Sequence, residues 1–189
     1  MDRREAIRKV ALIMGGTVLG SELFMQLGCN PSPEKVNDLF DQDQVLLLDE
    51  IAETILPETS TPGAKAAKVG AFMTVMVQDC YIPEDQKVFM KGLSDLDKSY
   101  NKKYGSSFLE GDSRSRTEFL SNLDEEQKKY AKEKKPEDPN HYFSMMKQLT
   151  LLGYFTSEAG ATKALRYLPI PGRYDGCTDY KKGDRAWAI

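Results

Sequence analysis

Two amphipathic stretches joined by a proline- and glycine-rich corner constrain the fold of this chain most strongly. In the first stretch, apolar side chains recur every three or four residues, which predicts a helix with one apolar face. The apolar positions are Val45, Leu48, Ala52 and Ile55. A capping box of Asp41 and Gln44 predicts where this helix begins, and Pro57 predicts where it ends.

The second stretch repeats the pattern after a turn at 59–63. Its apolar positions are Val69, Phe72, Met73, Met76, Val77 and Cys80. Two amphipathic helices with a short connection are expected to pack as an antiparallel pair, which is the usual start of an all-α domain. Asp49, Glu50 and Glu53 fall off the apolar face of the first helix. We therefore expect these carboxylates on its solvated side, without a chemical role.

The chain beyond this pair continues as a series of helices. They are expected at 83–105, 112–123, 124–135, 141–155 and 158–168. The stretch from 141 to 155 carries a stripe of methionine and aromatic residues, which is expected in the core or, alternatively, on a surface that adapts to a partner. Together the patterns predict an all-α fold, a compact bundle of about six or seven helices.

The last part of the chain differs from the rest. From Pro169 onward, proline, glycine and aspartate exclude a regular helix, yet this tail holds the only tryptophan, together with tyrosines and arginines. These three residue types contribute much of the binding energy at protein interfaces. We therefore expect an irregular C-terminal strap that either crosses the helical domain or docks on a partner.

Composition and motifs argue against nucleic-acid binding and against catalysis. The net charge is -3, and no basic stripe with interleaved aromatic residues is present. His141 is the only histidine, and the three cysteines are too few for a disulfide scaffold and lack the spacing of a zinc site. The sequence contains no dinucleotide-binding glycine motif, phosphate loop, nucleophile elbow or haem attachment motif. These observations predict a chain without catalytic, cofactor-binding or metal-binding residues.

The first 28 residues have the pattern of an export signal. Arg3 and Arg4, followed by a short apolar run at 11–19, resemble a twin-arginine signal, which an export receptor reads. The run is too short to span a bilayer, which needs about 20 residues. The alternative interpretation is a basic helix of a cytosolic protein.

Cys29 is the predicted site of lipid attachment. It ends the sequence QLGC, which resembles a bacterial lipobox, although glutamine stands where leucine is usual. Cleavage without lipidation and an uncleaved leader are the alternatives. We thus expect a signal peptide at 1–28, a tether at 29–40 and a helical domain at 41–189, in an exported, periplasmic or cell-envelope protein that a lipid holds at the membrane.

Three segments together resemble one protein family. They are the twin-arginine leader, DQVLLLDEIAETILPETSTPGAKAAKVGAFM at 43–73, and GYFTSEAGATKALRYLPIPGRYDGC at 153–177. They are similar to the gluconate 2-dehydrogenase subunit 3 family, the small subunit of membrane-associated, FAD-dependent sugar and sugar-acid dehydrogenases. The resemblance implies a mostly helical chain with no flavin or haem of its own.

The resemblance also implies a partner. In this family the small subunit pairs with a large FAD-dependent subunit of the glucose-methanol-choline oxidoreductase type, helps it to mature and carries it through the twin-arginine export machinery. FAD is therefore expected in the partner, and a cytochrome c subunit in the complex is left open. The residues of this chain expected to contact the partner are Tyr154, Phe155, Arg173, Tyr174 and Trp187.

For an exported member of this family, Cys80 and Cys177 would lie in an oxidising compartment, where disulfides persist. We expect them to pair, which would join the tail to the second helix and stabilise the fold by about 4–5 kcal/mol in the chain-entropy model. One alternative is a free, buried Cys80 with an exposed Cys177. Another is a bond from Cys177 to the partner chain.

Two other classes of function stay open beside the accessory subunit. A stand-alone, lipid-anchored binding module of the cell envelope would need a concave apolar pocket with a few convergent polar groups. An enzyme with a dispersed active site would need acids or a histidine of shifted pKa lining a pocket. The preferred prediction is a non-catalytic accessory subunit of an oxidoreductase complex.

Overall fold

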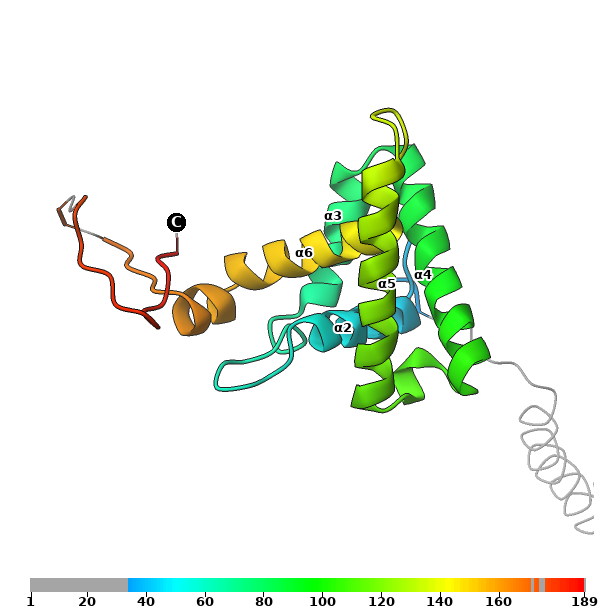
Figure 1. Cartoon of the computed structure of the whole chain (residues 1–189), viewed down its shortest axis with the longest axis horizontal. Coiled ribbons are helices and arrows are strands. Elements are labelled where there is room, and N and C mark those ends of the chain that lie inside the picture. Colours follow the sequence, from blue (N-terminus) through cyan, green and yellow to red (C-terminus); the bar gives the residue numbers. More distant parts are fainter. Residues whose placement is uncertain (1–33, 171, 174–175, 189) are drawn as a thin grey trace, which may run out of the picture. The chain divides into compact units, whose positions relative to one another are not determined.

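The computed structural model describes residues 34–170, 172–173 and 176–188, and these residues form an all-α fold (Figure 1). Its long helices are α2 (Gln42–Ile55), α3 (Val69–Cys80), α4 (Pro83–Tyr104), α5 (Ser113–Glu133) and α6 (Tyr142–Thr156). The short turns are η1 (Phe108–Glu110), a 3-10 turn before α5, and η2 (Gly160–Ala164), a π turn after α6. The predicted all-α class is confirmed. The predicted leader with Arg3 and Arg4, and Cys29, lie outside the described residues.

The capping box predicted for α2 is present. The Asp41 carboxylate accepts a hydrogen bond from the Gln44 backbone N–H at 2.9 Å, and the Gln44 side chain accepts one from the Asp41 N–H at 3.0 Å. These bonds satisfy donors that have no partner within the first helical turn. The helix ends at Ile55, and Leu56, which precedes Pro57, has left helical geometry as expected of a residue before proline.

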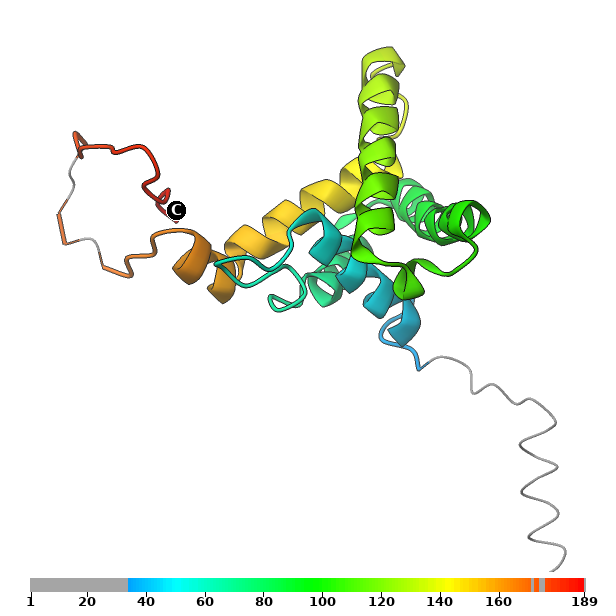
Figure 2. The ribbon, with the colours of Figure 1, turned by 60° about the horizontal axis from the view of Figure 1, so that its bottom comes forward.

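Helix α6 is central to the fold, because it contacts each of the other four long helices (Figures 1 and 2). Met146 is completely buried and Met145 nearly so, which confirms that the methionine stripe belongs to the core. Leu48 and Ile51 of α2 and Met73 of α3 are completely buried as well. Burial of a side chain of this size stabilises the fold by about 1.5–3 kcal/mol, so these contacts account for much of its stability.

The stretch at 113–133 forms one helix, so the predicted helix boundary at Asp124 is wrong. Asp112 caps this helix, as expected, by accepting hydrogen bonds from two N–H groups of its first turn. Asp124 lies in the middle of α5, where its carboxylate pairs with Lys128 at 2.8 Å and with Lys147 of α6 at 2.5 Å. These two cations lower the pKa of Asp124 to about 2 and stabilise its ionised carboxylate at this position in the middle of the helix.

The helix predicted at 158–168 is shorter than expected, because helical geometry covers only 158–164, where the π turn η2 forms its larger part. Ser157 caps this turn by accepting a hydrogen bond from the Gly160 N–H at 3.0 Å. A Cβ atom at Gly160 would lie 1.9 Å from the Tyr154 carbonyl oxygen, so the chain approaches the end of α6 too closely for a side chain. The chain is then extended at Leu165, which ends the helical geometry.

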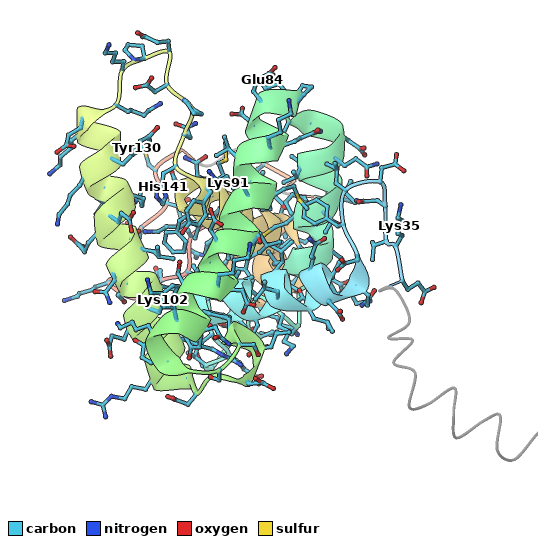
Figure 3. All side chains as sticks on the ribbon, turned by 90° about the vertical axis from the view of Figure 1, so that its right-hand side faces the viewer. Lys35, Glu84, Lys91, Lys102, Tyr130 and His141 are labelled. Carbon is cyan, nitrogen blue, oxygen red and sulfur yellow. The ribbon has the colours of Figure 1, made fainter. Side chains whose placement is uncertain are left out.

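His141 begins α6. Its Nδ1 atom accepts a hydrogen bond from the Phe143 N–H at 3.2 Å, and its ring stacks on Tyr142 and lies near Tyr130 (Figure 3). Burial lowers the pKa of His141 below its ordinary value of 6.5, and the nearby Glu126 carboxylate opposes this shift. The stabilisation that neutral His141 provides is therefore present above pH 6.5 and is lost as the pH falls through the folded-state pKa.

We expect the free energy of unfolding to fall slightly, by less than about 1 kcal/mol, as the pH drops from about 7 to about 5, because His141 is only partly buried. His141→Asn keeps a capping oxygen but does not titrate in this range, so the free energy of unfolding of this variant should fall less over the same pH change. Equilibrium denaturation at the two pH values measures the difference. An identical fall in both proteins would show that His141 does not couple to folding.

Candidate partner-binding site

Two carboxylates of α2 hold the corner at 56–68. The Glu53 carboxylate accepts hydrogen bonds from the N–H groups of Glu58 and Lys65, both at 2.8 Å. Asp49 accepts a hydrogen bond from the Gly70 N–H at 2.8 Å and so caps α3, which has no capping side chain next to it in the sequence. Burial raises the pKa of Asp49, and the hydrogen bond from Gly70 opposes the rise.

This arrangement overturns the prediction that the carboxylates of α2 are solvated and without a role. Asp49, Glu50 and Glu53 are all partly buried, because the corner and the start of α3 fold back over this side of the helix. A Cβ atom at Gly70 would lie 2.8 Å from the Asp49 backbone nitrogen. Helices α2 and α3 therefore approach each other at backbone distance at this point.

Glu50 connects the corner to α5. Its carboxylate pairs with Lys65 at 2.7 Å and with the Arg116 guanidinium. Arg116 also donates a hydrogen bond to the Phe108 carbonyl in η1 at 2.7 Å. Burial raises the pKa of Glu50, but the bonds from Lys65 and Arg116 outweigh it and leave the pKa below its ordinary value. One carboxylate thus joins α2, the corner and α5.

Tyr154 of α6 contacts the same corner. Its ring is buried, and its hydroxyl donates a hydrogen bond to the Pro62 carbonyl at 2.6 Å. A Cβ atom at the neighbouring Gly153 would lie 2.6 Å from the Phe72 ring, so α6 and α3 are in close contact here. The two segments that carry the family resemblance therefore meet in the folded chain.

Removal of the Tyr154 hydroxyl tests this contact. Tyr154→Phe is expected to lower the free energy of unfolding by about 1–2 kcal/mol, because the Pro62 carbonyl loses its donor while the ring still packs. Urea denaturation measures the loss, and Tyr167→Phe is the control, since that side chain is exposed. Equal stability of the Tyr154→Phe variant and the wild type would contradict a role for this hydrogen bond.

An exposed apolar stripe lies beside Tyr154 on α6. We define the α6 stripe as Leu151, Leu152 and Phe155, which are all exposed and, by their spacing, share one side of the helix. Phe155 packs edge-on against Tyr154, with 5.2 Å between the ring centroids. Of the two aromatic residues predicted to contact a partner, Tyr154 is buried against the corner and Phe155 is accessible.

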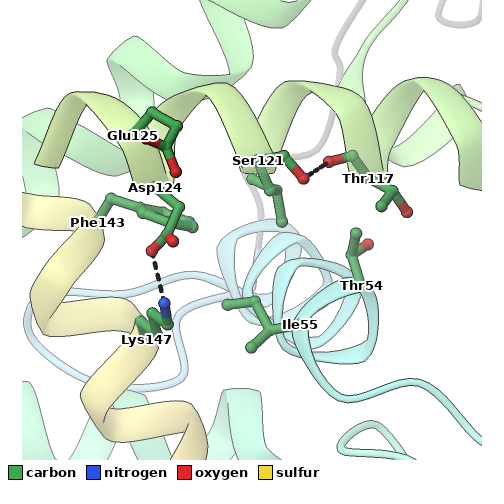
Figure 4. Close-up of a pocket in the computed structure, with 9 residues that line it drawn as sticks. Thr54, Ile55, Thr117, Ser121, Asp124, Glu125, Phe143 and Lys147 are labelled. Atoms are coloured by element: carbon green, nitrogen blue, oxygen red, sulfur yellow. Dashed lines mark hydrogen bonds and ion pairs between the residues drawn. The ribbon is translucent and has the colours of Figure 1, made fainter. Parts of the chain in front are cut away.

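A groove of about 330 Å³ lies between α2, α5 and α6 (Figure 4). Ile55, Leu120 and Phe143 give it an apolar floor, and the Asp124–Lys147 ion pair lies at one end. Because the pKa of Asp124 is lowered, this acid stays ionised and paired at neutral pH, which does not suit a general acid or base. No histidine or cysteine is among the residues that line the groove.

The described part of the tail is irregular, as predicted, and it folds back on the chain just after α6. Arg166 and Trp187 form an isolated parallel bridge, and the Arg166 guanidinium lies 4.5 Å from the centre of the Trp187 ring. Arg173 and Trp187, both predicted to contact a partner, are exposed. Tyr174, the third predicted contact in the tail, lies outside the described residues.

Cys80 and Cys177 are both exposed, and the structure contains no disulfide between them. The prediction that Cys80 lies on the buried stripe of α3 is wrong, because this last residue of the helix faces solvent, with its sulfur 4.0 Å from that of Met76. The disulfide to Cys177, and the alternative bond from Cys177 to a partner, stay predictions for the exported protein.

Two further features concern metals and membranes. Within the described ranges, no group of three or more histidine, cysteine, aspartate or glutamate side chains could hold a metal ion. No helix in this part of the chain is long and apolar enough to cross a membrane.

Fold and site together define an all-α domain with an exposed apolar stripe on α6, a corner held by side-chain hydrogen bonds and an irregular tail with exposed aromatic residues. The family model of gluconate 2-dehydrogenase subunit 3 matches residues 42–172, from the start of α2 into the tail, and the chain belongs to this family. No curated protein and no solved structure matches the chain. The family name denotes one subunit of a dehydrogenase complex, which implies association with other subunits.

Proposed function

We propose that this protein is the non-catalytic small subunit of an FAD-dependent sugar or sugar-acid dehydrogenase of the glucose-methanol-choline type. The observation that carries the proposal is the family match over residues 42–172. In this proposal the large subunit supplies the flavin and the active site. The small subunit supplies a contact surface, assists maturation and, through Arg3 and Arg4, provides the signal for export of the folded complex.

The chemistry of the described surface supports an accessory role. The ionisable groups that line the groove in Figure 4 are held in ion pairs. The α6 stripe, in contrast, exposes large apolar side chains to solvent. Aromatic and large aliphatic residues of this kind are typical of the centre of a protein–protein interface. The corner beside the stripe is held rigidly by Tyr154 and by the carboxylates of α2, so this surface keeps its shape before a partner binds.

Charge substitution within the stripe tests the partner contact. The full-length variant Leu152→Glu, Phe155→Glu is expected to capture at least about tenfold less flavoprotein from the envelope fraction than the wild type. Val75→Glu, an exposed apolar position on α3, is the matched control and should capture as much as the wild type. Equal losses in both variants would show that the effect is not specific to the stripe.

Export is tested at the leader. If the flavoprotein leaves the cytoplasm on the signal of this chain, the variant Arg3→Lys, Arg4→Lys should leave the folded flavoprotein in the cytoplasm. Immunoblots of cytoplasmic and envelope fractions measure this, and normal export in the variant would contradict the carrier role.

In the same fractions, Cys29→Ser should move the complex from the membrane pellet to the soluble envelope fraction if a lipid on Cys29 holds it there.

A further inference from the structure

The C-terminal segment forms a closed loop whose neck is made of backbone hydrogen bonds. The Arg166 N–H donates to the Ala186 carbonyl at 2.8 Å, and the Ala188 N–H donates to the Arg166 carbonyl at 2.8 Å. Arg166 Nε also donates to the Arg185 carbonyl at 2.6 Å. The residues on the two sides of the neck are therefore paired, although about twenty residues separate them along the chain.

Arg185 fastens the neck to the turn that follows α6. Its guanidinium donates to the Lys163 carbonyl at 2.7 Å and, with a longer bond of 3.4 Å, to the Thr162 carbonyl. Carbonyl groups at the end of a helical turn lack partners within it, and a cation satisfies them well. On the other side of the neck, Arg166 covers the Trp187 ring. We name Arg166, Arg185 and Trp187 the neck clasp.

The large apolar side chains described in the loop that the clasp closes are exposed to solvent. Tyr167, Leu168, Ile170, Tyr180 and Trp187 are between 48% and 82% exposed. Beside Tyr180 and Trp187 the loop encloses an open hollow of about 540 Å³. The neck holds its two sides together, and the described apolar side chains beside it are exposed, so they are available for a partner to cover.

The charge of the loop indicates what kind of surface covers it. From Arg166 to Ala188, both included, the sequence contains five lysines and arginines and three aspartates, a net charge of +2. The whole chain has a net charge of -3, so the loop is locally positive on an acidic protein. Complementary potentials favour a partner surface that is negative where the loop meets it.

We propose that this clasped loop is a docking arm, which inserts its exposed apolar side chains into an apolar cleft with an acidic rim on the large flavoprotein subunit. This inference rests on the proposed function and specifies the surface that the partner must offer. Ile170 and Tyr180 enter the cleft, and the clasp residues hold the arm in the shape that fits it. Arg185 is thus a positioning residue, which acts by keeping the neck closed.

The test uses tagged full-length variants captured from the native envelope fraction, with the flavin absorbance per captured tagged chain as the readout. Ile170→Asp and Tyr180→Asp are each expected to lower the captured flavin at least about tenfold. Val75→Asp is the matched control, because this residue is an exposed apolar side chain on α3, outside the loop. Higher salt should release the flavoprotein, as expected for contacts between opposite charges at a rim.

The clasp has a second readout. Arg185→Ala should speed hydrogen exchange at the Arg166 and Ala188 amides and lower the captured flavin about tenfold, and Arg185→Lys should restore part of both. Capture equal to the wild type by Ile170→Asp and Tyr180→Asp would overturn the docking arm and leave the proposed function standing. Fast exchange in Arg185→Ala with normal capture would overturn the positioning role. Wild-type chain captured without flavin would overturn the proposed function itself.

Discussion

Arg116→Ala is expected to lower the free energy of unfolding by about 3 kcal/mol. The Arg116 side chain is 12% exposed and its partner Glu50 is 18% exposed, so the ion pair is largely removed from water. The substitution leaves Glu50 with Lys65 alone and leaves the Phe108 carbonyl with only the longer hydrogen bond from the Gly111 N–H, at 3.3 Å. Loss of one member of a buried pair is strongly destabilising, because the remaining charge stays buried.

Lys103→Ala is the control for this prediction. Lys103 of α4 pairs with Glu118 of α5, but both side chains are exposed, so the loss of this pair should leave stability within experimental error. Denaturant unfolding of the two variants measures the difference, and Arg116→Lys should fall between Arg116→Ala and the wild type because lysine keeps the charge but not the forked donor geometry. Equal stability of the Arg116→Ala and Lys103→Ala variants would contradict a central role for Arg116.

Gly92→Ala is expected to destabilise the fold by about 2 kcal/mol, although alanine favours a helix over glycine by about 1 kcal/mol. Gly92 lies inside α4, and a Cβ atom there would lie 2.3 Å from the Cβ and 2.1 Å from the Cγ atom of Tyr142. The backbone of α6 fixes the position of the Tyr142 Cβ atom, so rotation of the side chain cannot relieve this contact. The substitution must therefore push α4 and α6 apart.

Gly153→Ala is the comparison, because its Cβ would meet a ring atom of Phe72 at 2.6 Å and a ring can turn. We expect a smaller loss of stability there. A second readout comes from Tyr142, whose pKa burial raises to about 12. In Gly92→Ala the separation of the helices should expose the phenol and lower its pKa, seen by ultraviolet titration. A stabilised Gly92→Ala variant would show that the α4–α6 contact is looser than described.

Local sequence signals predicted the helix ends well. The capping box at Asp41, the proline at the start of α4 and the glycine after its end all act within a few residues of the helix end that they mark. Gly105 has φ of 78°, a left-handed conformation that glycine adopts without strain. The error at Asp124 arose because a local signal was misleading. In the sequence this aspartate resembles a helix cap, and only the folded structure shows that it pairs with Lys147 on another helix.

The candidate site was predicted only in part, because its bonds join distant residues. Asp49 and Gly70 are 21 residues apart, and Tyr154 and Pro62 are 92 apart, so periodicity along one helix could not show either contact. Asp49 and Glu53 are one turn apart on the same side of α2. That spacing, followed by a corner of short polar residues with free N–H groups, is the signal that could have indicated their role in holding the corner.

The central claim is that this chain docks on a larger FAD-containing subunit. Affinity capture of the tagged wild-type protein from its native envelope fraction, with an absorbance spectrum of the eluate, tests it most directly. The account predicts a second, larger chain and the absorption spectrum of a flavin in constant ratio to the tagged chain. A colourless eluate that contains the folded, exported chain alone would contradict the claim and would favour a stand-alone binding module of the cell envelope.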